Sequence, residues 1–472
     1  MSLRPVLLFL IAVLLGTSPA SGRDASALPL PAHGVIGVTP ERMAPDYWLE
    51  RAGQADRVLM QASAIRAQNA RLLARDPSMH DLSKMPATLD RKRVRGWIED
   101  LSKIPGYTLY DRHGKKIDKA TLDGFEAQLD LGAIAASQTT RFGLIVHRAS
   151  LRTFPTDTRV FRSADDTDID RFQETAEFPG TPVVIAHASR DGKWLFVVSP
   201  RYAAWVHREA VAEGDRKTVL DYRAEAPARI ITGAHVRTVF TPEQPPLSQL
   251  ELDMGLRVPL ASGLAPDAPV NGQSAYTSWP LLLPIRKADG TLALKPALLQ
   301  RVADSHADYL PLTRANIIRQ AFKFLGERYG WGHMYNGRDC SGFVSEVYRS
   351  MGAMLPRNTS AQSVSPALEH QLFDEKDGHA ERMQAVSKLQ IGDLVYIPGH
   401  VMMVIGHVDG KPWVIHDVSG IRYRLPDGTL RHIKLNEVSL TPLEPLLYND
   451  SSSFIDHMTS IVRVAHPTES AP

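Results

Sequence analysis

The chain's only cysteine lies where a reactive thiol would be expected. Cys340 follows Asp339, a residue type that caps helices well, and an apolar helical pattern begins at once after it. Unpaired N–H groups and the dipole at a helix start favour the thiolate, so this position is expected to lower the thiol pKa. A nucleophilic cysteine also needs a base within hydrogen-bond reach and a third group that orients the base.

Two downstream histidines suit these two roles. His400 begins an apolar strand and His416 ends the next one. A regular two-residue turn at Asp409-Gly410 would pair Met403 with His416 and leave His400 on the opposite face. We therefore predict an irregular hairpin, in which a bulge or a longer turn brings both imidazoles to one face.

The surrounding segment, residues 293–472, has the pattern of an α+β domain. A helix is predicted over residues 313–326, and a second helix begins at about Cys340 with Phe343, Val344 and Val347 on its apolar face. Apolar runs predict strands at residues 394–397, 401–408, 413–415 and 461–464.

Upstream, the pattern changes to short β-rich runs. Predicted strands at residues 181–188 and 194–198 flank Asp191-Gly192, a hairpin signal, and Asp289-Gly290 marks another turn. We expect two small all-β barrels of the SH3-like kind, at residues 136–215 and 216–292. Such barrels usually bind or position other groups. Residues 23–135 are expected to form a helical N-terminal region, with three- and four-residue apolar spacings.

Composition limits the possible functions. A chain of 472 residues with 43% hydrophobic and 22% charged residues should fold into several globular domains. Its 54 Lys and Arg residues against 52 Asp and Glu give a net charge of +2, which does not indicate a nucleic-acid partner. No Gly-x-x-x-x-Gly-Lys-Ser/Thr motif occurs, and no cofactor is implied. Nothing in the sequence indicates an oligomeric state.

The N-terminus reads as a secretory signal peptide. Arg4 precedes an apolar run over residues 5–15, and small residues follow up to Gly22. The run is short of the roughly 20 residues needed to span a bilayer. We therefore expect residues 1–22 to be removed and the protein to be exported, periplasmic or extracellular, without a membrane anchor. A lone cysteine excludes an intramolecular disulfide.

The motifs as a set resemble the NlpC/P60 cysteine peptidases, which have a papain-like core. The resemblance rests on Asp339-Cys340-Ser341-Gly342-Phe343, Gly392-Asp393-Leu394-Val395, Gly399-His400-Val401 and Ile415-His416. A helical N-terminal region followed by two bacterial SH3-like domains also resembles exported family members that cut peptidoglycan stem peptides. The expected architecture is thus a multidomain chain with a C-terminal α+β papain-like domain.

The resemblance implies hydrolysis of the bond between γ-D-glutamate and a diamino acid, usually meso-diaminopimelate. Cys340 would be the nucleophile, His400 the general base and His416 the orienting residue. Asp339 and Ser341 would help to hold a free L-alanine amine, and the cleft-lining positions are matched by Trp331, Arg357 and Thr359. Asn358 departs from the family, where an acidic residue is common. The expected partners are stem peptides or muropeptides.

Three other interpretations use the same residues differently. Cys340, His400 and His416 could hold Zn²⁺ with a water, although no closely spaced ligand pair such as Cys-x-x-Cys supports a metal site. A non-catalytic wall-binding protein could act through its SH3-like modules, but all three triad positions are filled. Acyl transfer is known on this fold, often with the histidine before the cysteine, whereas here the cysteine comes first.

Overall fold

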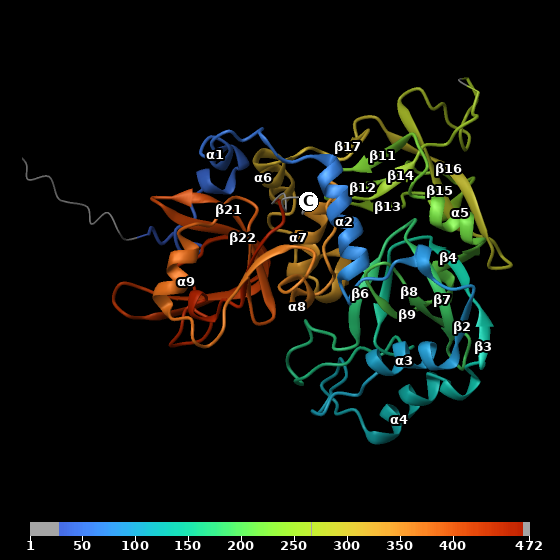
Figure 1. Cartoon of the computed structure of the whole chain (residues 1–472), viewed down its shortest axis with the longest axis horizontal. Helices are drawn as coiled ribbons and strands as arrows, with labels where there is room; N and C mark the ends of the chain where they lie inside the picture. The colour runs from blue at the N-terminus through green and yellow to red at the C-terminus, as the bar shows by residue number, and fades with distance from the viewer. Residues whose placement is uncertain (1–27, 266, 466–472) are drawn as a thin grey trace, which may run out of the picture.

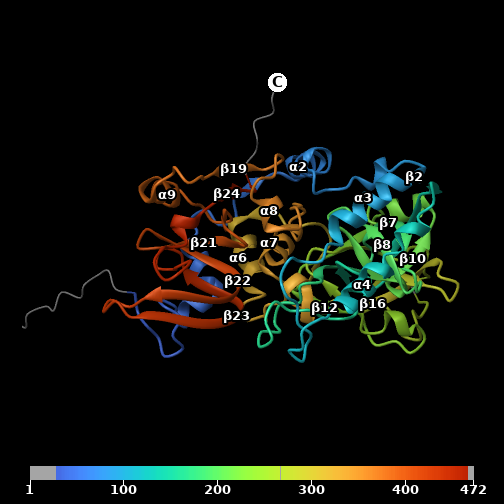
Figure 2. The same cartoon turned by 90° about the horizontal axis from the view of Figure 1, so that it is seen from below.

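The computed structural model describes residues 28–265 and 267–465. The predicted signal peptide, residues 1–22, lies outside the described residues. Figures 1 and 2 show the C-terminal domain beside two β-rich modules, with one N-terminal helix between them. Within the described ranges, no helix has the length and apolar character needed to cross a membrane.

The C-terminal domain is built on a six-stranded antiparallel sheet in the order β19-β24-β20-β21-β22-β23. Helices α6 and α7 pack on one face of this sheet and α9 on the other, each over its own apolar core. The predicted α+β composition is therefore confirmed. The elements are β18 (Leu312–Thr313), α6 (Arg314–Phe322), α7 (Cys340–Arg349), α8 (Thr359–Gln362), β19 (Glu369–Leu372), α9 (His379–Val386), β20 (Leu394–Ile397), β21 (His400–Val408), β22 (Lys411–Arg424), β23 (Leu430–Pro442) and β24 (Ser460–Arg463).

The first β module, residues 141–214, is a seven-stranded antiparallel sheet in the order β10-β4-β7-β8-β9-β5-β6. The predicted hairpin at Asp191-Gly192 joins β7 to β8, and Ala188 pairs with Leu195. Apolar side chains form one core on each side of the sheet. The strands are β4 (Arg141–Ile145), β5 (Ala149–Arg152), β6 (Gln173–Glu177), β7 (Pro182–Ala188), β8 (Trp194–Val198), β9 (Ala203–His207) and β10 (Val211–Gly214).

The second β module, residues 228–306, contains three small antiparallel sheets around one core. The predicted turn at Asp289-Gly290 joins β15 to β16, and this hairpin crosses residue 292, where the predicted domain boundary lies. A boundary that keeps paired strands together falls after His306, because β17 pairs with β11. Its SH3-like character stays a prediction. The strands are β11 (Ala228–Ile231), β12 (His235–Arg237), β13 (Glu251–Asp253), β14 (Arg257–Pro259), β15 (Ser278–Arg286), β16 (Leu292–Gln300) and β17 (Ser305–His306); the short helix α5 (Arg216–Asp221) precedes them.

The N-terminal segment does not form a body of its own. Its first half packs on the C-terminal domain: β1 pairs with β18, and Trp48 contacts Trp413. Its second half packs on the first β module, where Val94 and Phe125 join the core. The elements are α1 (Pro45–Leu49), β1 (Val58–Met60), α2 (Ala62–Arg75), β2 (Thr88–Asp90), α3 (Arg91–Leu101), α4 (Lys119–Gln128) and β3 (Ser137–Thr139).

Candidate active site

Cys340 is the first residue of α7, and the structure explains why the helix begins there. The Asp339 side chain caps the helix by accepting a hydrogen bond from the Gly342 N–H at 2.8 Å. Apolar residues of α7 then pack on the sheet and hold the helix in place. The Cys340 side chain is 5% exposed, and its sulfur accepts a hydrogen bond from the Val401 backbone N–H. The thiol therefore lies beside the first residues of β21.

The expected lowering of the thiol pKa is wrong for the protein in this state. Burial raises the pKa of Cys340 to about 12, and the neighbouring Asp339 carboxylate adds to the rise. The Val401 N–H opposes this shift without overcoming it. A helix N-terminus favours a thiolate by a modest amount, whereas full burial costs several pKa units. These effects together favour the neutral thiol of Cys340 at neutral pH.

His400 and His416 meet as predicted in space. Nε2 of His400 lies 2.8 Å from Nδ1 of His416, and Nε2 of His416 lies 3.0 Å from Oγ1 of Thr441. If His400 is to accept a proton at Nδ1, its Nε2–H must donate to His416, and His416 must in turn donate to Thr441. Burial lowers the pKa of His400 to about 4, so its imidazole is neutral at neutral pH.

The hairpin that carries these histidines is irregular, as predicted. The turn at Asp409-Gly410 pairs Val408 with Lys411, but the register shifts between Val404 and Gly406. Met403 consequently pairs with Ile415 and not with His416. A one-residue bulge of this kind reverses the face on which later side chains lie. It is what allows His400 and His416 to make their hydrogen bond.

A buried ion pair holds the segment before the thiol. The Arg357 guanidinium is 3% exposed and donates to both carboxylate oxygens of Asp339, at 2.7 and 3.1 Å. It also donates to Oγ of Ser341 and to Oγ1 of Thr175 in the first β module. Burial alone would raise the pKa of Asp339, but Arg357 and the hydrogen bonds lower it to about 2. The ring of His333 completes this cluster, 2.9 Å from Arg357.

The other predicted cleft residues occupy different positions. Trp331 is half-buried and donates from Nε1 to the Gln173 carbonyl of β6, at 3.0 Å. Thr359 is the half-buried first residue of α8. Asn358 before it is exposed and is hydrogen-bonded to Tyr202 of the first β module. The first β module therefore borders the thiol-containing site through β6 and Tyr202.

Two polar residues of the site were not found from the sequence. Thr441 lies on β23, far along the chain from any motif, and only its pairing beside β22 brings it to His416. Asp417 follows His416 directly; its side chain is inaccessible, and neither carboxylate oxygen has a hydrogen-bond partner among the described residues. Burial raises the pKa of Asp417 well above its usual value. Its position next to a motif histidine was the one available signal.

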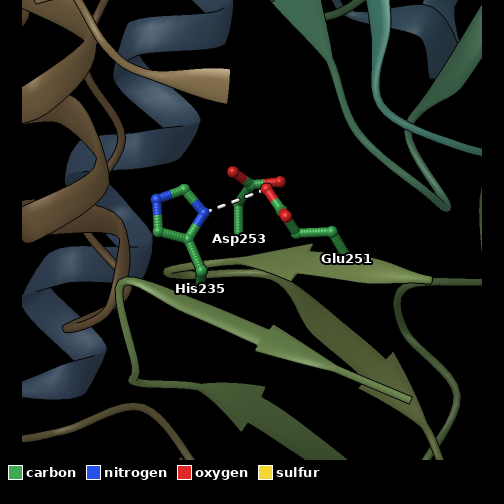
Figure 3. Close-up of side chains that lie close together, drawn as sticks. All are labelled: His235, Glu251 and Asp253. Atoms are coloured by element: carbon green, nitrogen blue, oxygen red, sulfur yellow. Dashed lines mark hydrogen bonds and ion pairs between the residues drawn. The ribbon is translucent and has the colours of Figure 1, made fainter. Parts of the chain in front are cut away.

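A separate cluster of possible metal-ligating groups, His235, Glu251 and Asp253, lies on β12 and β13 (Figure 3). The Asp253 carboxylate already accepts hydrogen bonds from two arginines. Arg338 donates to Oδ1 at 2.8 Å, and Arg148 donates to the same oxygen. Burial would lower the pKa of His235, but hydrogen bonds to Glu251 and Glu327 outweigh it and raise the pKa to about 9. The contacts of this cluster are those of an ion-pair network, because His235 pairs with Glu251 and Glu327 while Asp253 pairs with the two arginines.

With this geometry established, comparison with known proteins identifies the C-terminal domain. The model of the NlpC/P60 family matches residues 326–436, which include Cys340, His400 and His416. This segment is an NlpC/P60 domain. A model described as an SH3 domain of the SH3b1 type matches residues 159–207, within the first β module. Thr441 lies outside the matched part of the NlpC/P60 domain, although its side chain contacts His416.

Two individual proteins are similar to the chain, one in sequence and one in fold. Dipeptidyl-peptidase 6 of Lysinibacillus sphaericus is 26% identical over 114 residues, which are 24% of this chain and 35% of that protein. The match thus spans about a third of that relative's length. An NlpC/P60 endopeptidase from Photobacterium damselae subsp. piscicida has a similar fold, with a TM-score of 0.70, 15% identity, and coverage of 89% of this chain and 97% of that one. The fold similarity extends well beyond the NlpC/P60 domain.

Proposed function

We propose that the protein is an exported cysteine endopeptidase that hydrolyses peptidoglycan stem peptides at the γ-D-glutamyl–diaminopimelate bond. The observation that carries the proposal is the hydrogen-bonded series His400, His416 and Thr441 beside a helix-capped thiol in an NlpC/P60 domain. Residues 1–22 would direct export. The SH3b1-type module next to the thiol would limit which peptides reach it.

The geometry supports a thiol acylation mechanism. As the Cys340 sulfur attacks the scissile carbonyl carbon, its proton passes to Nδ1 of His400, which makes no hydrogen bond within the described residues. The resting thiol and imidazole are both neutral, so proton transfer accompanies formation of the carbon–sulfur bond. The backbone N–H of Cys340 would hold the oxyanion. His400 then protonates the departing amine, and water releases the acyl group from the thioester.

Recognition of a free N-terminal amine is the finer part of the proposal. Asp339 was the expected partner of this ammonium group, but its carboxylate already accepts bonds from Arg357, Ser341, Gly342 and Gly332. Glu174 has more capacity to accept hydrogen bonds from an ammonium group, because within the described residues its two oxygens accept only from the hydroxyl groups of Thr153 and Tyr202. An unneutralised carboxylate on β6 would attract an ammonium group near the thiol.

The proposal is tested with the purified protein and its Cys340→Ala variant. Each is incubated with L-Ala-γ-D-Glu-diaminopimelate, with the same peptide N-acetylated, and with intact sacculi, and the products are read by mass spectrometry. We expect the wild type alone to release L-Ala-γ-D-Glu and to leave the acetylated peptide intact. Glu174→Gln should raise KM for the free peptide at least tenfold, with Glu209→Gln as an exposed control in the same module.

Other outcomes would reject specific parts of the proposal. Equal cleavage of the acetylated peptide would remove the free-amine requirement while leaving the peptidase intact. Binding to sacculi without cleavage of any substrate would favour the non-catalytic wall-binding protein. Cleavage by the Cys340→Ala variant would exclude thiol catalysis.

A further inference from the structure

A large cavity lies away from the thiol, where four parts of the chain meet. Its volume is about 850 Å³, and its lining comes from β1 and α2, from both β modules, and from α7 with the loop that follows it. Figures 1 and 2 show α2 lying between the C-terminal domain and the β modules. Cys340 begins α7, but the cavity is lined by the later residues Ser345 and Arg349. It is thus a separate compartment of ligand-binding size.

The charge of this cavity is strongly one-sided. Two carboxylates, Glu177 and Asp308, face five lining arginines, which are Arg66, Arg201, Arg223, Arg257 and Arg349. Asp308 is exposed, whereas Glu177 is 4% exposed and accepts a hydrogen bond from Ser199. Four of these arginines are half-buried and Arg66 is exposed, and an arginine stays charged at neutral pH, so the lining has an excess of positive charge.

Neutral groups, not carboxylates, hold most of these guanidinium groups. Arg223 donates to the Gly180 carbonyl and to Thr181, and Arg257 donates to the carbonyls of residues 223 and 225. Arg349 donates twice to the Met254 carbonyl, and its contact with Glu346 is longer, at 3.6 Å. Carbonyl oxygens fix the orientation of an arginine without cancelling its charge. These three guanidinium groups therefore have fixed orientations and keep their positive charge.

Arg201 differs from the other half-buried arginines of the lining, each of which has hydrogen-bond partners. Its guanidinium makes no hydrogen bond or ion pair within the described part of the chain. Burial and the nearby charge of Arg349 lower the pKa of Arg201 to about 10, a shift that an anion in the cavity would reverse. An arginine in this position has donors available for a ligand.

Much of the remaining lining is apolar. It includes side chains from β1 and α2, from the turn before α6 and from the segment after α7, which are Val58, Met60, Ile65, Leu73, Leu310, Leu312, Met351, Met354 and Leu355. The exposed residues Arg66 and Tyr309 lie at its edge. We propose that this cavity is a second ligand site, which binds an organic anion with a carboxylate or phosphate head and an apolar body.

Isothermal titration calorimetry on the full chain tests this site without relying on turnover. The probes are octanoate and octyl phosphate, with inorganic phosphate for the head alone and octylammonium for the same apolar body with opposite charge. We expect octanoate or octyl phosphate to bind with a stoichiometry of one per chain. Whichever of the two binds more tightly identifies the preferred head group. Octylammonium should not bind, and inorganic phosphate should bind at least tenfold more weakly than the octyl anions.

The variants assign the binding to the arginine wall. Arg201→Gln should weaken anion binding at least tenfold, because charge-assisted hydrogen bonds are lost, and Arg201→Lys should keep most of it. Arg431→Gln, at an exposed arginine of β23, is the matched control and should bind as the wild type does. The Arg201 guanidinium has no hydrogen-bond partner within the described residues, so the melting temperature of Arg201→Gln should be no lower than that of the wild type. Absence of binding, equal binding to Arg201→Gln, or equal binding of octylammonium would overturn the proposal.

Discussion

Arg338 and Asp253 form an ion pair across the interface between the NlpC/P60 domain and the second β module, with 2.8 Å between Nη2 and Oδ1. Both side chains are completely inaccessible. Arg338 lies two residues before Cys340 and also pairs with Glu327 and Glu346. The position of Cys340 is therefore linked to a module that contributes no residue to the hydrogen bonds among His400, His416 and Thr441.

Removal of the charge on Asp253 should destabilise the whole protein. Asp253→Asn leaves Arg338 and Arg148 buried without their shared carboxylate, and a broken buried pair costs about 3 to 5 kcal/mol. We expect a lower free energy of unfolding in urea and a lower melting temperature. Asp267→Asn, at an exposed aspartate of the same module, is the control. Equal stability of the two variants would show that the network contributes little.

The same network should make stability depend on pH through His235. Its folded pKa is raised from 6.5 to about 9, so protonation is favoured in the folded state. The stabilisation of the folded state by protonated His235 is complete below pH 6.5 and is lost as the pH rises through about 9. The charged groups facing this ring are Glu251, Asp253, Glu327 and Arg338. The difference in melting temperature between wild type and His235→Gln should shrink across this range, and a constant difference would argue against it.

The chemical reactivity of Cys340 should reflect its raised pKa. Below a pKa of about 12, each pH unit increases the thiolate fraction tenfold, so the rate of alkylation by iodoacetamide should keep rising past the pH at which free cysteine levels off. Because the chain has one cysteine, total labelling measured by mass spectrometry reports on this thiol alone. A plateau near neutral pH would instead indicate a resting thiolate–imidazolium pair.

Thr441 should be a positioning residue for His416. Thr441→Val keeps the side-chain shape but removes the oxygen that lies 3.0 Å from Nε2 of His416. We expect kcat for the tripeptide to fall about tenfold with KM unchanged, because the orientation and tautomer of His416 are less well defined. Thr441→Ser restores the hydroxyl and should restore most of kcat. A rise in KM with kcat unchanged, or no recovery of kcat in the Thr441→Ser variant, would contradict this role.

Local signals in the sequence were enough to predict the helix that begins at Cys340 and the contact between His400 and His416. The helix cap before Cys340 is observed, and His400 begins its strand as predicted. His416 does not end the next strand, because β22 continues to Arg424, but it meets His400 as predicted. The irregular hairpin was also predictable, because strand periodicity shows that a regular turn would separate His400 from His416. The helix cap and the hairpin depend on residues close in sequence, where backbone geometry decides the outcome.

Features that depend on distant residues were decided by the tertiary structure. The pKa of Cys340 rises because the folded chain buries the thiol, an effect that overrides the helix dipole. Thr441, the Thr175 contact of Arg357 and the Asp253 contact of Arg338 come from segments that the sequence gives no reason to join. The arginine cavity likewise exists only where four parts of the chain meet. Burial and long-range pairing arise from packing, which local patterns do not encode.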